Sequence, residues 1–193
     1  MRYPSGHKEA TRRKILEAAL KVFRNQGFGG GGVDTVMNEA GLTAGGFYAH
    51  FRNKEDLLIQ MLSCSPDLMR DGLNLHLGEL EGPDWVEGFI DLYLSPQQVM
   101  AEQNCCPLPS VISEIERQSQ DCRNSFAELF GQWAEMLASR LTNLPKKERR
   151  TRAESLNTIL IGTVTMARAL IGTPQFDGVL KNGRDSAKRL IRG

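Results

Sequence analysis

A run of glycines near the N-terminus has the spacing of a nucleotide-binding loop. In the stretch NQGFGGGGVDTV, Gly27, Gly29 and Gly32 satisfy the pattern G-x-G-x-x-G. In dinucleotide-binding enzymes these glycines let the backbone approach a pyrophosphate closely. The pattern requires a β-strand directly before the first glycine, because the strand aims the turn at the phosphate. The residues before Gly27 therefore decide whether an oxidoreductase is a serious candidate.

Those preceding residues have the pattern of an amphipathic helix over 8–26. Apolar side chains recur there at spacings of three and four residues, with charged side chains between them. Gly27 occupies the position at which such helices commonly end. A helix in place of the strand argues against a dinucleotide site, so an oxidoreductase stays only as a remote alternative.

Other reactive side chains do not gather into a recognisable site. The cysteines Cys64, Cys105, Cys106 and Cys122 are too sparse for a disulfide scaffold, and they form no C-x-x-C pair. The three histidines are scattered, which gives a metal site little support. We therefore expect no metal, no cofactor and no catalytic residues, and reduced thiols in the cytoplasm.

Charge is distributed unevenly along the chain, although the formal net charge is only +1. Residues 1–60 contain nine Lys and Arg and six Asp and Glu, whereas the remainder contains 15 basic and 17 acidic residues. A basic N-terminal third on a nearly neutral body fits a small anion-binding head, and chance unevenness is the alternative. No stretch approaches the ~18 apolar residues of a membrane span. The N-terminal MRYPSGHKEATRRK lacks the apolar core of an export signal.

The segment after the glycines predicts a helix-turn-helix. Apolar residues mark one face of a short helix over 33–40, and Gly41-Leu42 breaks it. Thr43 is a good N-cap for a second helix over 44–51, which carries two phenylalanines on one side. Asn53 then caps a helix that begins at Lys54. Two short helices around a glycine-containing turn, bracketed by longer helices, are typical of DNA-binding heads.

The rest of the chain predicts further helices and no strand. We expect a kink or restart at Pro66, and a loop or broken helix from Ser95 to Ser110. The charged stretch LPKKERRTR is expected to be a junction. The later helices are predicted over 83–94, 111–117, 121–144 and 153–171, with a last one starting at Thr173-Pro174. The predicted fold class is all-α, with about nine helices in total.

The N-terminal third resembles the TetR family of bacterial transcriptional regulators over Thr11 to Leu62. The resemblance is carried by TRRKILEAALKVFRNQGF and by VDTVMNEAGLTAGGFYAHFRNKEDLLIQML, which contains A-G-L-T-x-x-x-F-Y-x-H-F-x-x-K-E-x-L. DLYLS and CCPLPSVISEI resemble a subset of the family with a Y-L-S…G-C-P-L pattern. The resemblance implies a DNA-binding domain over 1–52 and a ligand-binding and dimerisation domain over 53–193. It further implies a cytoplasmic homodimer, with no membrane partner, that leaves operator DNA when a small-molecule inducer binds.

The resemblance and the local pattern together select the residues expected to contact DNA. Family positions matching Tyr48, His50 and Lys54 contact phosphates, which fix register without reading sequence. Thr43 can cap its helix, contact a phosphate, or do both. Family members often carry a longer polar side chain in the first turn of the recognition helix, and none is present here, so the small residues there would let the backbone approach the groove. The expected contacts are Thr35, Thr43, Ala44, Gly45, Gly46, Tyr48, His50 and Lys54.

The body offers candidates for effector sensing and dimerisation. Cys106 precedes a proline at the start of a short helix, where the dipole would favour a reactive thiolate, and some family members sense oxidants with a cysteine in this region. An inert buried thiol is the alternative. The apolar stripe Ile159, Thr163, Met166, Ala167 and Leu170 is expected at the dimer interface. The predicted pocket walls are Trp85, Phe89, Tyr93, Phe126 and Trp133, for which ordinary core packing is the alternative.

These observations predict a sequence-specific DNA-binding transcriptional regulator rather than an enzyme. We expect a repressor that is released from its operator by a small-molecule inducer or a thiol-reactive compound. A DNA-binding or architectural protein without induction is the alternative from a different class. On this interpretation the glycine run is a mobile hinge between the first helix and the helix-turn-helix, because glycines raise the entropic cost of ordering a loop.

Overall fold

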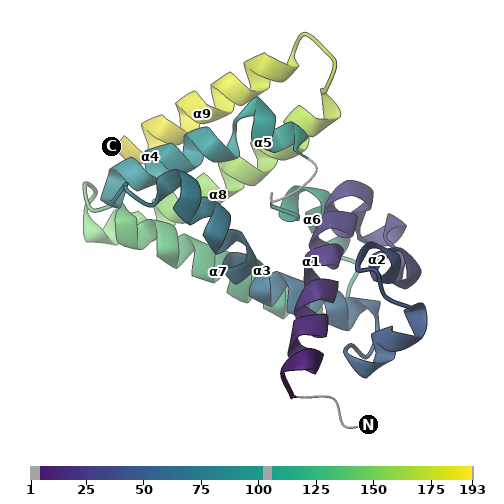
Figure 1. Ribbon diagram of the computed structural model, residues 1–193. Helices are drawn as coiled ribbons and strands as arrows, with labels where there is room; N and C mark the ends of the chain where they lie inside the picture. Colours follow the sequence, from purple (N-terminus) through teal and green to yellow (C-terminus); the bar gives the residue numbers. More distant parts are fainter. Residues whose placement is uncertain (1–4, 102–105, 193) are drawn as a thin grey trace. The chain divides into compact units, whose positions relative to one another are not determined.

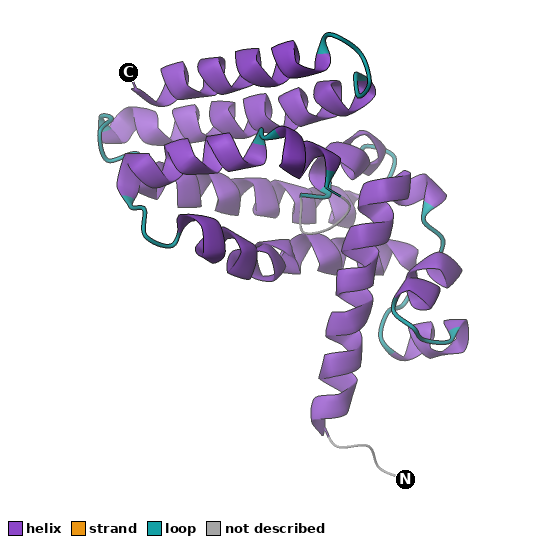
Figure 2. Cartoon of the chain, turned by 45° about the horizontal axis from the view of Figure 1, so that its top comes forward, coloured by secondary structure: helices purple, strands orange, loops and turns teal. Residues whose placement is uncertain are grey.

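The computed structural model describes residues 5–101 and 106–192, and all regular structure in this part of the chain is helical (Figures 1 and 2). Nine α-helices and one short 3₁₀ helix follow one another there, without a strand. The predicted all-α class is therefore confirmed. The helices are α1 (Ser5–Gly30), α2 (Val33–Glu39), η1 (Ala44–Ala49), α3 (Lys54–Leu77), α4 (Gly82–Tyr93), α5 (Pro96–Met100), α6 (Leu108–Ile115), α7 (Gln120–Arg140), α8 (Lys146–Ala169) and α9 (Phe176–Arg192).

The chain forms two compact units, each built from two separate stretches of sequence. The head unit runs to Leu68 and adds Cys106–Phe126, so α6 and the start of α7 join the N-terminal helices. The body unit contains the described residues within 69–101 and 127–192. Compactness does not measure which residues contact DNA or ligand. The functional boundary expected between 52 and 53 therefore stays a prediction.

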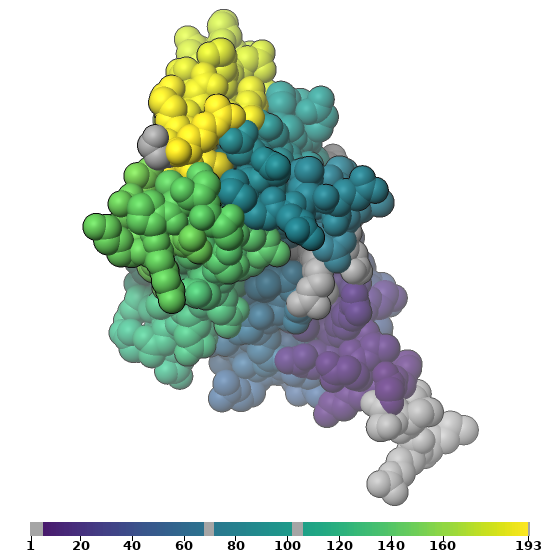
Figure 3. Space-filling model, turned by 90° about the vertical axis from the view of Figure 1, so that its left-hand side faces the viewer, coloured from purple at the N-terminus to yellow at the C-terminus, as the bar shows by residue number. Residues whose placement is uncertain are grey.

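Each unit has its own packing scheme. In the head unit, α1 packs against α2 and α6, and α2 packs against η1. In the body unit, α8 packs along α9, α4 also contacts α9, and α5 contacts α4 and α8. Figure 3 shows α9, in yellow, lying against the blue-green segment that contains α4. Among the described residues, no helix is both long enough and apolar enough to cross a membrane.

A helix, not a strand, leads into the glycine run. The first helix begins at Ser5, a little earlier than predicted, and its regular backbone is interrupted at Gly27, which has φ 70° and ψ 173°. This conformation is open to glycine and strained for other residues. The predicted end of the helix at Gly27 is confirmed, and the strand that a dinucleotide site requires is not there.

Of the two expectations at Pro66, the restart was wrong, because α3 continues through this residue from Lys54 to Leu77, whereas the kink stays a prediction. Proline cannot donate to the carbonyl four residues earlier, which here belongs to Leu62. The hydroxyl of Ser65 donates to that carbonyl at 2.9 Å. A neighbouring side chain thus takes over the hydrogen bond that the proline cannot make, and the helix persists.

The expectation that LPKKERRTR is a junction was also wrong, because most of this stretch forms the first turns of α8. The helix begins at Lys146 directly after Pro145, and α7 ends at Arg140 rather than Leu144. Side chains four residues apart pair along these turns, with Arg152 at 2.9 Å from Glu148. Such pairs support a helix whose sequence is too polar to show an apolar stripe. Smaller shifts move α6 to Leu108–Ile115 and α9 to a start at Phe176, and Pro96–Met100 is a short helix.

Candidate nucleic-acid interface

The helix-turn-helix is held together by its turn. The amide of Gly41 donates to Asn38 and the amide of Leu42 donates to Met37, both at 2.9 Å. Gly41 has φ 65°, a left-handed conformation that glycine adopts at little cost. The glycine predicted to break the first helix therefore has a geometric role in turning the chain toward η1.

The second helix of the motif is a 3₁₀ helix over Ala44–Ala49, not the α-helix predicted to reach Phe51. Its first turn contains Gly45 and Gly46, which are poor helix formers, and this favours the short tighter form. Thr43 occupies the N-cap, but its side chain makes no capping hydrogen bond within the described residues. The expected capping role of its hydroxyl is therefore not observed.

Phe47 and Phe51 anchor η1, whereas its other side chains face outward. Both phenylalanines are buried, with ring centroids 5.5 Å apart. Tyr48 is 72% exposed although it neighbours a buried ring. Among the expected contact residues, Thr43, Ala44 and Gly45 are also exposed, and Thr35, Gly46 and His50 are half-buried. The structure thus brings most of the expected residues to the surface of one short element.

His50 ends η1 with one ring nitrogen inside the protein. Its Nδ1 is buried and has no hydrogen-bond partner in the described part of the chain. Burial lowers the pKa of His50, and the positive charges of Lys8 and Arg12 lower it further. The imidazole is therefore neutral near pH 7, and the approach of a phosphate would favour its protonation.

Lys54 is engaged inside the head unit. Its ammonium donates to the carbonyl oxygen of Phe28 and lies 4.3 Å from the centroid of the Phe28 ring. Burial lowers the pKa of Lys54, whereas the nearby charge of Glu114 raises it. For Lys54 to reach a DNA phosphate, as the sequence led us to expect, it would have to leave Phe28.

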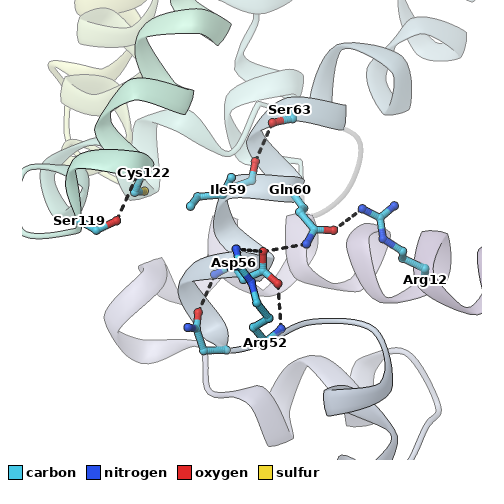
Figure 4. Close-up of polar contacts among 9 residues, drawn as sticks. Arg12, Arg52, Asp56, Ile59, Gln60, Ser63, Ser119 and Cys122 are labelled. Carbon is cyan, nitrogen blue, oxygen red and sulfur yellow. Dashed lines mark hydrogen bonds and ion pairs between the residues drawn. The ribbon is translucent and has the colours of Figure 1, made fainter.

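A polar network that sequence reasoning missed fixes the turn between η1 and α3 (Figure 4). The buried carboxylate of Asp56 accepts from the amide of Arg52 at 2.8 Å and from the Gln60 side chain at 2.9 Å. Gln60 in turn accepts from Arg12 on α1. Burial alone would raise the pKa of Asp56, but the hydrogen bonds from Arg52 and Gln60 lower it below its ordinary value. Asn53 and Asp56, three residues apart at a helix start, were a capping-type signal that could have pointed to this network.

The aromatic residues expected to line a pocket are split between the units. Phe89 stacks on Trp85 with centroids 5.3 Å apart and on Trp133 with centroids 6.1 Å apart, and Tyr93 also contacts its ring. These four residues form one cluster in the body unit. Phe126 is assigned to the head unit. Whether the cluster lines a ligand site stays a prediction.

The described cysteines differ in environment. Cys122 is buried, and burial raises its pKa to about 11, with the charge of Glu55 acting in the same direction. Burial also raises the pKa of Cys64. Cys106 is half-buried and not part of a disulfide, and it directly precedes the proline before α6. Cys105 lies outside the described residues. No group of three His, Cys, Asp or Glu that could hold a metal occurs in the described ranges.

The residues of the apolar stripe expected at a dimer interface differ in burial along α8. Ala167 is buried inside the body unit, and Thr163 lies against Gly183 of α9. Met166 is 57% exposed. The exposed side of α8 instead consists mainly of small residues around Met166, namely Thr158, Gly162, Thr165 and Ala169.

Comparisons with known proteins agree with this architecture. Residues 15–61 match the family model described as bacterial regulatory proteins, tetR family. The chain is 24% identical to the HTH-type transcriptional regulator LmrA of Bacillus subtilis over 170 residues, which cover 81% of this chain and 86% of LmrA. It is 27% identical to the HTH-type transcriptional repressor SCO4008 of Streptomyces coelicolor, covering 95% and 90% of the two chains. A solved TetR-family regulator from Cytophaga hutchinsonii has the same fold, with a TM-score of 0.76 at 20% identity over 98% of this chain and 96% of that one.

Proposed function

Because this chain belongs to the TetR family of bacterial regulatory proteins and is a DNA-binding transcriptional regulator, we propose that it is a dimeric repressor released from its operator by a small molecule. The proposal includes no catalytic step and no cofactor. The observation that carries it is the exposed face of η1, on which Tyr48 is 72% exposed while its neighbour Phe47 is fully buried. A large aromatic side chain kept in water beside a buried anchor is well placed to meet a partner.

On DNA, the exposed face of η1 faces the major groove. Tyr48 and Thr43 donate hydroxyl hydrogens to phosphates, and His50 joins them when it is protonated. The small residues Ala44 and Gly45 allow the backbone to lie close to the bases. Sequence preference then rests on Thr35 together with DNA shape.

A dimer of two copies places two helix-turn-helix motifs on the two half-sites of a palindromic operator. We propose the exposed side of α8 as the dimer surface, with Met166 surrounded by small residues. Gly162 supports this, because a Cβ added there would meet no described atom within 4 Å, which leaves room for a partner helix. The bacterial cytoplasm, where the chromosome lies, is the proposed place of action.

The effector site is proposed at the aromatic cluster of the body unit. The Nδ2 of Asn157 on α8, in the same unit, is buried without a partner among the described residues, so a ligand that reached it would need a hydrogen-bond acceptor. A buried amide donor without an acceptor costs about 1–3 kcal/mol, which a ligand would recover. Both tryptophans of the chain, Trp85 and Trp133, belong to the cluster. Their intrinsic fluorescence therefore provides a direct screen for small molecules that bind there.

A thiol-reactive compound acting on Cys106 is the second candidate signal. Cys106→Ser would then leave operator binding intact and abolish release by an alkylating agent. If neither small molecules nor alkylation releases the DNA, the alternative of a DNA-binding protein without induction is favoured.

Selection of genomic fragments by the purified protein tests the proposal. We expect recovery of a palindromic sequence, and the genes beside it would indicate the effector class. In a titration of the recovered duplex, Tyr48→Phe should weaken binding modestly for every sequence, since a phosphate contact carries no base preference. Failure to select any DNA, even at low salt, would reject the proposal.

A further inference from the structure

The glycine run is an anion cradle, and its occupant is a side chain of the protein itself. The carboxylate of Glu114 accepts from the amide of Phe28 at 2.8 Å and from the amide of Gly29 at 2.5 Å. Glu114 lies on α6, in the same compact unit as α1. Successive backbone N–H groups directed at one anion are the arrangement by which glycine-rich loops hold phosphates. The sequence pattern is thus typical of anion binding by backbone amides, but the anion here is a carboxylate of the protein and not a pyrophosphate.

The glycines make room for this carboxylate. A Cβ added at Gly27 would lie 2.7 Å from Oε1 of Glu114, and one added at Gly29 would lie 2.8 Å from Oε2. Neither distance is compatible with an undisturbed carboxylate. A Cβ at Gly30 would meet only the Cβ of Gln26 at 3.4 Å. Gly27 and Gly29 are therefore required by the cradle, whereas Gly30 is not.

A cation binds the same segment through a carbonyl oxygen. Lys54, at the start of α3, donates to the carbonyl oxygen of Phe28, whose own amide is bound by Glu114. A second contact from α6 lies one turn away, where the hydroxyl of Ser110 donates to the carbonyl of Arg24 at 2.6 Å. The end of α1 is thus bound by charged or polar side chains from α3 and α6 at once.

We propose that Glu114 is a positioning residue for operator binding. The segment it holds is the last part of α1, after the break at Gly27, which leads into α2, the first helix of the helix-turn-helix. Without the carboxylate, consecutive glycines would leave this connection with many conformations, and DNA would have to select one of them. By ordering the connection in the free protein, Glu114 removes that loss from the binding equilibrium. The inference rests on the proposed function, because it assigns to Glu114 a part in DNA binding without contact to DNA.

Four variants of the full chain separate this role from general effects on folding. Glu114→Gln keeps the length of the side chain but removes its charge. Gly29→Ala leaves the glutamate in the sequence, but its added methyl group displaces the carboxylate. The matched controls are Glu116→Gln, which removes an equal charge from an exposed residue next to α6, and Gly30→Ala, which adds a methyl group where there is room. Circular dichroism confirms that each variant is folded.

Two readouts are measured for each variant. Amide hydrogen exchange at Phe28 and Gly29 should accelerate at least about tenfold in Glu114→Gln and Gly29→Ala, because charge-assisted hydrogen bonds are lost. Affinity for the duplex selected by the wild-type protein should fall by about tenfold in the same two variants, with an unchanged salt slope, since no phosphate contact is removed. The double variant should lose little more than either single one, because both changes break one interaction. The controls should match the wild type in both readouts.

The outcomes that overturn the inference are distinct. Unchanged exchange at Phe28 and Gly29 in Glu114→Gln would show that the cradle is not occupied in solution. Faster exchange with operator affinity within twofold of the wild type would show that the cradle has no part in positioning. If Glu114→Gln fails to fold, Gly29→Ala against Gly30→Ala gives the same decision. Failure of the wild type to bind any duplex would reject the proposed function, whereas the exchange readout would still test the cradle.

Discussion

The ring of Tyr48 stands edge-on against the ring of Phe47, with centroids 5.2 Å apart and planes at 90°. Phe47 is fully buried in the head unit, whereas Tyr48 is 72% exposed. Of these two consecutive residues, Phe47 anchors η1 in the core, and Tyr48 packs against that anchor while most of its side chain stays exposed. The buried phenylalanine fixes the position of η1, and this in turn fixes where the exposed tyrosine lies on the surface.

Gly45→Ala is expected to stabilise the protein and to weaken DNA binding. An added Cβ would meet no described atom within 4 Å, so the change lowers the entropy of the unfolded chain without a clash. We expect a gain of about 0.4–1 kcal/mol in the free energy of unfolding, measured by urea denaturation. Affinity for the selected operator should fall, because the methyl group separates the backbone from the groove.

The control for this variant is Gly72→Ala, at an exposed glycine of α3 where a Cβ also meets nothing within 4 Å. It should raise stability by a similar amount and leave DNA affinity unchanged. Equal or higher operator affinity in Gly45→Ala would contradict a close approach of this turn to DNA.

If His50 contacts a phosphate, we expect operator affinity to rise as the pH falls from about 7.5 to about 6. Burial and the neighbouring positive charges lower its pKa in the free protein, so the imidazole starts neutral. A phosphate raises that pKa, and the complex therefore binds more protons than its separated parts. Uptake of one proton corresponds to at most about tenfold in affinity per pH unit. Titrations at several pH values should show this slope in the wild type and lose it in His50→Gln, and equal slopes in the two proteins would argue against the contact.

Asp56→Asn is expected to destabilise the head unit by about 1–3 kcal/mol at neutral pH, because a buried carboxylate that accepts several hydrogen bonds loses its charge. The pKa of Asp56 is lowered in the folded protein, so its contribution is present above the unfolded value near 3.9 and is lost as the pH falls. Thermal melts should show a difference between the variant and the wild type that shrinks below about pH 4.

Glu17→Gln serves as the control for Asp56→Asn. Glu17 pairs with Arg13 at 3.0 Å, but its side chain is 51% exposed, and exposed pairs contribute little. A loss of stability in Asp56→Asn no larger than in this control would show that the network is not structurally important.

The thiols are expected to react with iodoacetamide in a fixed order. Burial raises the pKa of Cys122 to about 11, so at pH 8 this residue is almost entirely the unreactive thiol. Cys106 is half-buried and should react first in the folded protein. Peptide mapping by mass spectrometry after brief labelling tests the order, with a Cys105→Ser background to remove the adjacent thiol. Labelling of Cys122 as fast as Cys106 would contradict the described environments.

Gly32→Ser should stabilise the start of α2. Gly32 is the N-cap, with φ −73° and ψ 162°, which a serine adopts without strain, and an added Cβ would meet only Oγ1 of Thr35 at 3.7 Å. The serine hydroxyl can accept a backbone N–H that is otherwise unpaired, for a gain of a few tenths of a kcal/mol, roughly. Amide exchange over residues 28–40 should slow, and unchanged exchange would indicate that this end of the helix is already rigid.

The sequence predicted the elements better than it predicted their terminal and internal details. Apolar spacing sufficed for α1, α4 and α7, because the buried face of a helix repeats regularly. It failed at the start of α8, where ion pairs between side chains replace an apolar stripe, and at Pro66, where Ser65 satisfies the carbonyl of Leu62. Both failures involve polar side chains that stabilise a helix locally, which periodicity cannot detect.

The site shows a similar division. The exposed position of Tyr48 followed from its place beside the phenylalanine face. The contacts of Glu114 with Phe28 and Gly29 did not, because they join residues about 86 positions apart and depend on how α6 packs against α1. The glycine pattern is typical of loops that bind an anion, and the loop does bind one. Only the packing of the helices identified that anion as a carboxylate from the same chain.

The dependence of operator affinity on salt tests the central claim most directly. If the face of η1 binds DNA through phosphates, log K for the selected duplex should fall linearly with log salt concentration, with a slope of about −0.9 for each phosphate contacted. Tyr48→Phe should weaken binding across the whole series. An affinity that does not change with salt, or a Tyr48→Phe variant that binds as tightly as the wild type at every concentration, would contradict the account.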